Sequence, residues 1–190
     1  MKSLNSNRGL WTFLSGLLII SLISLTCNAQ EKKLTREEKR DLRKREAESR
    51  FASLDSLIRS GRFVLQADFL QGRSGERINV NSTINFVRVN LGKGTLQVGT
   101  VSGMGYNGVG GVTAEGDIRS WKEDVNSKNR SITVRFTIES TLGHYDILLI
   151  ASPDNLSTAT VTGLSSGMLS WSGRIVPLRS SRVFQGQTNF

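Results

Sequence analysis

From Arg62 to the end of the chain, apolar side chains recur at every second position in short runs, and glycine-containing turns separate these runs. The run at residues 131–139 is the cleanest, since Ile132, Val134 and Phe136 alternate with polar residues. A period of two places successive side chains on opposite faces of a β-strand. The pattern therefore predicts a mainly β fold in which one face of each strand is buried.

About eight strands are expected, joined by tight turns, at residues 63–69, 79–91, 95–100, 112–118, 131–139, 145–151, 155–162 and 168–176. No helical pattern alternates with them, which excludes a parallel βαβ organisation. The expected architecture is an antiparallel β-sandwich or a flattened barrel. A change of phase in the second strand predicts a β-bulge near Phe86, and the strand at 145–151, apolar on both faces, is expected to be central. Val183 and Phe184 are expected to pack back onto the core.

A long charged helix is expected before the strands. Residues 31–59 lack glycine and proline, Thr35 and Glu38 fit a capping box, and Gly61 stands where a helix would end. The second half carries an apolar stripe at helical spacing, formed by Ala47, Phe51, Leu54, Leu57 and Ile58. We therefore divide the chain into a helical segment at 30–59, docked through its second half, and a β domain at 60–190.

This helix has two interpretations. Its many basic side chains could make a peripheral contact with a membrane or a partner. Alternatively, it is a docked helix with a solvated outer face, because acids and bases alternate at i,i+4 spacing, as in Asp41–Arg45 and Glu46–Arg50.

The first 29 residues have the pattern of a cleaved signal peptide. Lys2 and Arg8 precede an apolar stretch at residues 11–25, which is short for a membrane span of ~20 residues. Small residues at Cys27 and Ala29 favour cleavage after Ala29 and predict a periplasmic protein. The alternative is a lipoprotein anchored through Cys27, the only cysteine of the chain.

The charge balance narrows the class of partner. Without Lys2 and Arg8 the chain keeps 23 basic and 16 acidic side chains, a net charge of +7. Export argues against nucleic acid, so anionic headgroups or envelope polymers are the expected partners, with solubility as the plain alternative.

The glycine-rich stretch at residues 99–116 is the most unusual part of the chain. Residues 103–108 match the spacing G-x-G-x-x-G, but no helix pattern follows, which argues against a dinucleotide site. The glycines either form turns at positive φ, expected at two or more of Gly105, Gly108, Gly110 and Gly111, or let the backbone approach a ligand contacted by Met104 and Tyr106.

Other candidate site residues are few. Arg174 and Arg182 could bind an anionic group or pair with carboxylates of the domain itself. His144 is the only histidine, so a zinc site of histidines is excluded, and no serine lies in a nucleophile elbow. No catalytic residue, metal or cofactor is expected.

Four stretches carry a resemblance to a known family: residues 61–68, 107–111, 115–116 and 181–184. In this order, behind a signal peptide and a charged helix, the chain resembles the exported bacterial family called domain of unknown function 4251. The resemblance implies an envelope protein of Gram-negative bacteria and brings no catalytic residues. The leading hypothesis is a non-enzymatic binding or interaction module; the alternative is a periplasmic hydrolase with dispersed catalytic residues.

Overall fold

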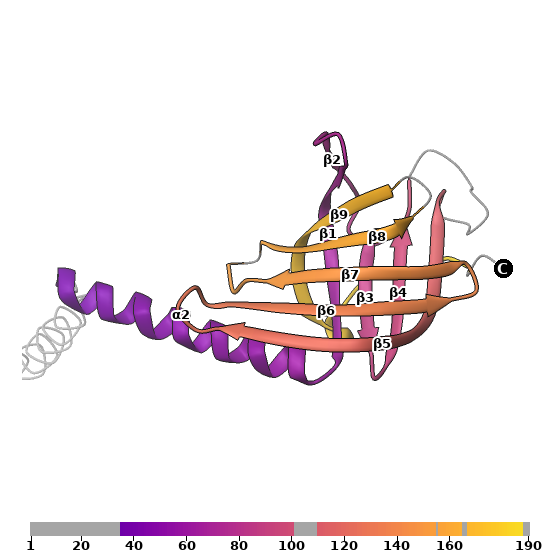
Figure 1. Cartoon of the computed structure of the whole chain (residues 1–190). Helices are drawn as coiled ribbons and strands as arrows, with labels where there is room; N and C mark the ends of the chain where they lie inside the picture. Colours follow the sequence, from indigo (N-terminus) through magenta and orange to yellow (C-terminus); the bar gives the residue numbers. More distant parts are fainter. Residues whose placement is uncertain (1–34, 101–109, 155, 165–166, 188–190) are drawn as a thin grey trace, which may run out of the picture. The chain divides into compact units, whose positions relative to one another are not determined.

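The structure is a computed structural model that describes residues 35–100, 110–154, 156–164 and 167–187. Within these ranges one α-helix precedes nine strands, and a 3₁₀ turn follows them (Figure 1). The elements are α2 (Arg36–Arg59), β1 (Arg62–Gly72), β2 (Arg77–Asn79), β3 (Phe86–Asn90), β4 (Lys93–Val98), β5 (Val112–Asn126), β6 (Ser131–Ser140), β7 (Gly143–Ala151), β8 (Ser157–Leu164), β9 (Gly167–Pro177) and η1 (Leu178–Ser180).

The strands form a closed antiparallel barrel. Each strand from β3 to β9 pairs with the next, β1 pairs with β3, and β1 also pairs with β9, so eight of the described strands close on themselves. The short strand β2 adds to β1 outside this ring. The expected mainly β fold is confirmed, and of the two expected architectures the barrel is the one formed. Closure leaves no long unpaired edge on the eight strands.

The inward side chains fill the barrel and leave little room. Trp171 of β9 is fully buried, and its indole nitrogen donates to the carbonyl of Gln97 at 3.2 Å. Gly94 of β4 faces Gly116 of β5, and a Cβ on Gly94 would lie 2.6 Å from a side-chain carbon of Ile138. Gly94 therefore makes the space that Ile138 occupies, whereas Gly116 lets the backbone of Glu139 approach closely.

Helix α2 has the ends that its sequence predicts. The Glu38 amide donates to the Thr35 hydroxyl at 3.2 Å, the Thr35 amide donates to the Glu38 carboxylate at 2.8 Å, and Gly61 has φ +60°. Ile58 is fully buried and Leu54 nearly so, both as part of the barrel core, so the second half is docked as expected.

The strand expected at residues 79–91 is interrupted, and the bulge predicted near Phe86 is wrong. A turn lies between β2 and β3. The Asn81 carboxamide oxygen accepts from the Thr83 amide at 3.0 Å, and the Asn81 carbonyl accepts from the Asn85 amide at 3.1 Å. Because an Asn side chain can bond its own backbone two residues on, it competes with strand pairing and starts a turn here.

The pairings β1–β9, β5–β6 and β8–β9 shift register instead, and the shift in β5 shapes a site described below. This strand runs past Ile118 to Asn126, and its pairing with β6 shifts between Arg119 and Lys122, so that two residues oppose Phe136. Of these two, Ser120 has a left-handed φ of 54° and Trp121 stacks on Phe136. Because of this shift, Glu123 lies on the inner face of the barrel, opposite Val134.

The glycine prediction is met at one position that the structure describes. Gly110 has φ +75°, as expected. Gly111 lies outside the left-handed region, but a Cβ there would collide with the carbonyl of Val98, so close backbone approach is its reason for being glycine. Gly105 and Gly108 lie outside the described residues.

Candidate binding site

The site residues suggested by the sequence are scattered. Met104 and Tyr106 lie outside the described residues. Arg174 of β9 lies 3.9 Å from the carboxylate of Asp68 on β1, and Arg182 is exposed in the segment after η1.

His144 is exposed on β7. Its neighbour on the same face, Asp146, accepts a hydrogen bond from the hydroxyl of Thr137 at 2.8 Å. In the described part of the chain, no three His, Cys, Asp or Glu side chains gather closely enough to hold a metal ion. Nor is any helix in that part long and apolar enough to cross a membrane.

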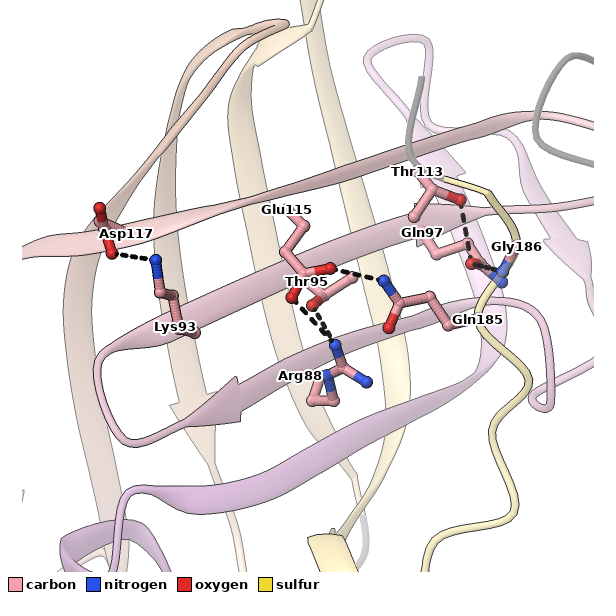
Figure 2. A network of polar contacts seen from close by, with 9 residues as sticks. All are labelled: Arg88, Lys93, Thr95, Gln97, Thr113, Glu115, Asp117, Gln185 and Gly186. Atoms are coloured by element: carbon pink, nitrogen blue, oxygen red, sulfur yellow. Dashed lines mark hydrogen bonds and ion pairs between the residues drawn. The ribbon is translucent and has the colours of Figure 1, made fainter. Parts of the chain in front are cut away.

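A cluster of polar side chains covers the outer face of β3, β4 and β5, and Gln97 lies at the end of it that adjoins Gly186 (Figure 2). Gln97 is fully buried. Its amide nitrogen donates to the carbonyls of Ile84 and Phe184 at 3.0 and 2.9 Å, while its oxygen accepts from the Thr113 hydroxyl and the Gly186 amide at 3.0 and 2.8 Å. Two donations and two acceptances are the full capacity of a carboxamide. We call Gln97 and the polar residues around it on this face the Gln97 cluster.

The Gln97 cluster binds the C-terminal segment through its neighbours as well. The Gln185 amide donates to Glu115 at 2.6 Å, and Glu115 also lies 3.5 Å from Arg88. The backbone amide of Phe184 donates to the carbonyl of Thr83 at 2.8 Å, whereas the Phe184 side chain is 63% exposed. The expectation that the Phe184 side chain packs on the core is therefore wrong, because this segment docks through polar groups instead.

The end of the barrel next to α2 is different, because a depression of about 350 Å³ opens there. Trp121 lines it and is 37% exposed, and the centroid of its ring lies 5.2 Å from that of Phe136. Ile58, Val89 and Ile118 supply apolar walls. We call this depression the barrel mouth.

Two opposite charges also line the barrel mouth. Glu123 keeps 18% of its side chain exposed, but its Oε1 is buried without a hydrogen bond from any described residue. The Nη2 of Arg59 lies 3.5 Å from this oxygen, and the Nε of Arg59 donates to Asp55 at 3.0 Å. The hydrogen bond with Asp55 and the charges of Asp55 and Glu123 raise the pKa of Arg59 above its usual value, so the guanidinium stays charged.

A larger groove of about 710 Å³ lies along another side of α2. Its lining includes the apolar side chains of Leu57 and Leu178, together with Arg62 of β1 and Arg179 of η1. A smaller depression of about 380 Å³ shares Leu57 with the groove and includes Arg50. Among the described residues, no carboxylate lines either depression. We call the two together the arginine groove.

The sequence pointed to none of the residues that line these openings as site residues. Arg62 and Arg179 are 117 positions apart, and the pairing of β1 with β9 brings their elements together. For the barrel mouth a weak signal exists, because the alternation of β5 breaks at Ser120-Trp121 before the strand continues.

The chain was compared with known proteins. The model of the family "Domain of unknown function (DUF4251)" matches residues 45–175. Among solved structures, the chain is similar to the crystal structure of a DUF4251 family protein from Bacteroides eggerthii DSM 20697. That similarity has 32% sequence identity and a TM-score of 0.58, and covers 70% of this chain and 91% of the other. No curated protein matches. The family model spans most of the chain, and the fold is similar to that of a solved member of the same family. This protein therefore belongs to the DUF4251 family.

Proposed function

We propose that the protein is exported and works in the cell envelope as a non-catalytic binding module for a ligand with an anionic group. The observation that carries this proposal is the arginine groove, whose lining combines basic and apolar side chains and includes no described carboxylate.

The guanidinium groups are the charged donors that the groove offers to a ligand, beside the neutral side chains of Ser56 and Asn90. The hydroxyls of Ser53 and Ser60 donate to helix carbonyls, at 2.9 and 2.6 Å, so their protons are already used. Arg62 and Arg179 are both exposed, and each has a planar set of N–H groups that matches a carboxylate or a phosphate. A volume of about 710 Å³ is within the range of roughly 300–1,000 Å³ that is usual for small-ligand sites.

Export is supported by the sequence pattern of the first 29 residues. An exported protein meets anionic headgroups and polymers in the envelope, which agrees with the net charge of +7 after cleavage. Sequencing of the N-terminus of protein isolated from its own host should begin at Gln30. A diacylated Cys27 would instead establish the lipoprotein alternative, and an intact Met1 would contradict export.

The ligand can be sought by native mass spectrometry of protein purified from its own envelope. We expect a bound anionic species that is lost in the double variant Arg62→Gln/Arg179→Gln. The control Arg73→Gln/Lys128→Gln removes the same two charges from exposed turns and should keep the species. Equal retention by both variants, or equal loss, would contradict a site in the groove. Conversion of the bound species to a product by the wild-type protein would favour the hydrolase instead.

A further inference from the structure

The barrel mouth is built by an irregularity of the backbone. Ser120 adopts a left-handed φ of 54°, a conformation that is unfavourable for a residue other than glycine. Without the bulge, the alternation of β5 would turn Lys122 inward; with it, Glu123 faces inward and Trp121 lines the opening. Bulges that re-aim side chains in this way are common beside functional sites.

The carboxylate of Glu123 is arranged in a way that folding does not require. Its Oε1 is buried without a hydrogen bond from the described residues, and the contact with Arg59 at 3.5 Å is too long to supply a strong one. Burying a polar atom without a hydrogen bond is unfavourable. The Glu123 side chain keeps 18% of its surface exposed, so a ligand in the depression can donate a hydrogen bond to the accessible part of this carboxylate.

The charges of the barrel mouth select against ions. Arg59 and Glu123 are the charged side chains that line it, one of each sign, so a cation or an anion would meet a like charge. A neutral ligand with hydroxyl groups can donate to Glu123 and accept from Arg59 at the same time. The indole of Trp121 and the aliphatic walls would pack on the C–H face of such a ligand.

From this combination we infer that the barrel mouth binds a neutral saccharide, with Trp121 as the packing surface and Glu123 and Arg59 as the hydrogen-bonding pair. A volume of about 350 Å³ is near the lower end of the range of small-ligand sites, roughly 300 Å³, which suits a ligand of one or two sugar rings. This site is distinct from the arginine groove and does not depend on the function proposed for it.

The test is binding of three neutral disaccharides, cellobiose, maltose and N,N′-diacetylchitobiose, measured by saturation-transfer NMR and calorimetry. At least one should bind saturably at millimolar concentration or below. Trp121→Ala should weaken that binding at least about tenfold, which corresponds to the loss of ~1.4 kcal/mol. Glu123→Gln should weaken it several-fold, because one acceptor oxygen becomes a donor.

Matched controls separate the site from general effects on the fold. Phe184→Ala removes an exposed ring elsewhere, Glu139→Gln removes an exposed carboxylate, and neither should change the affinity. Trp121→Phe keeps an aromatic ring and should retain binding better than Trp121→Ala; it also serves as the test if the alanine variant does not fold. Failure of all three sugars to bind would overturn the proposal. So would wild-type affinity in both Trp121→Phe and Glu123→Gln, or displacement of the sugar by tetramethylammonium or inorganic phosphate.

Discussion

Strand β5 carries two glutamates that illustrate two different uses of a polar side chain. Glu115 belongs to the Gln97 cluster, where it accepts from Gln185 and faces Arg88. Glu123 belongs to the barrel mouth, where one of its oxygens is buried without a hydrogen bond from the described residues. The chain itself supplies the hydrogen-bond donor for Glu115, whereas Glu123 is left with capacity to accept a hydrogen bond from a ligand.

The difference follows from what covers each region. The C-terminal segment lies over the outer face of β3 to β5 and supplies backbone and side-chain partners. The barrel mouth is bordered by α2, whose nearest side chains, Ile58 and Arg59, leave a depression beside β5. A fully satisfied polar cluster contributes to stability, while groups kept ready for a ligand commonly reduce it.

The largest effect is expected from Gln97→Leu. The variant removes the Gln97 hydrogen bonds of two carbonyls, the Thr113 hydroxyl and the Gly186 amide, and each such loss at a buried group costs about 1 kcal/mol or more, so we expect a loss of at least about 4 kcal/mol. Urea unfolding measures it. The control is Gln71→Leu, because the exposed side chain of Gln71 donates only to the Gly75 carbonyl in a turn. Equal stability of the two variants would mean that the Gln97 cluster contributes nothing.

A somewhat smaller effect is expected where α2 borders the barrel mouth. Ile58→Ala should lower the free energy of unfolding by about 3 kcal/mol, because Ile58 is fully buried. Phe51→Ala should cost less, since Phe51 is only partly buried against the core. Arg40→Ala should stay within roughly 0.5 kcal/mol. Thermal or urea unfolding of the three variants checks this order, and a larger loss for Phe51 than for Ile58 would contradict the docking described here.

Local sequence signals predicted much of the fold. The capping residues Thr35 and Glu38, the helix end at Gly61 and the alternating strands each depend on residues close together in the chain, and the structure bears them out. Closure by β1 and β9 has no local signal, because it joins segments about a hundred residues apart, and a sandwich would use the same alternation.

The polar regions were harder to predict for the same reason. Gln97 occupies an ordinary outward position of a strand, and two of its partners, Phe184 and Gly186, are 87 and 89 residues away. Glu123 faces inward only because the bulge at Ser120 changes the phase of β5, and the sequence predicts a strand at 112–118 with an extension to Trp121 as its furthest limit. A search for breaks in alternation inside an otherwise regular strand could have drawn attention to this position.

The comparison between the two glutamates can be tested on the folded protein directly. Glu115→Leu should destabilise by about 1–3 kcal/mol, because Gln185 loses its acceptor and Arg88 keeps only the Thr95 hydroxyl. Glu123→Leu should leave the stability unchanged or raise it by up to about 1 kcal/mol, because it removes a buried oxygen that has no hydrogen bond. Urea unfolding measures both. A loss for Glu123→Leu as large as that for Glu115→Leu would show that the barrel mouth is also part of the folding core.

The smallest effect is expected at the exposed edge of the network in Figure 2, where Lys93 pairs with Asp117 at 2.7 Å. The hydrogen bond and charge of Lys93, with a smaller contribution from Arg119, hold the pKa of Asp117 below its usual value of 3.8. Because the pKa is lower in the folded state, the pair contributes stability above pH 3.8, and the contribution disappears as the pH falls through the folded-state pKa. Lys93→Met should therefore be slightly less stable than the wild type at pH 7, and the difference should vanish at strongly acidic pH. Urea unfolding across this range measures it, with Lys128→Met as the control for loss of one exposed charge. A difference that persists unchanged in acid would assign the effect to packing of the Lys93 side chain instead of to the ion pair.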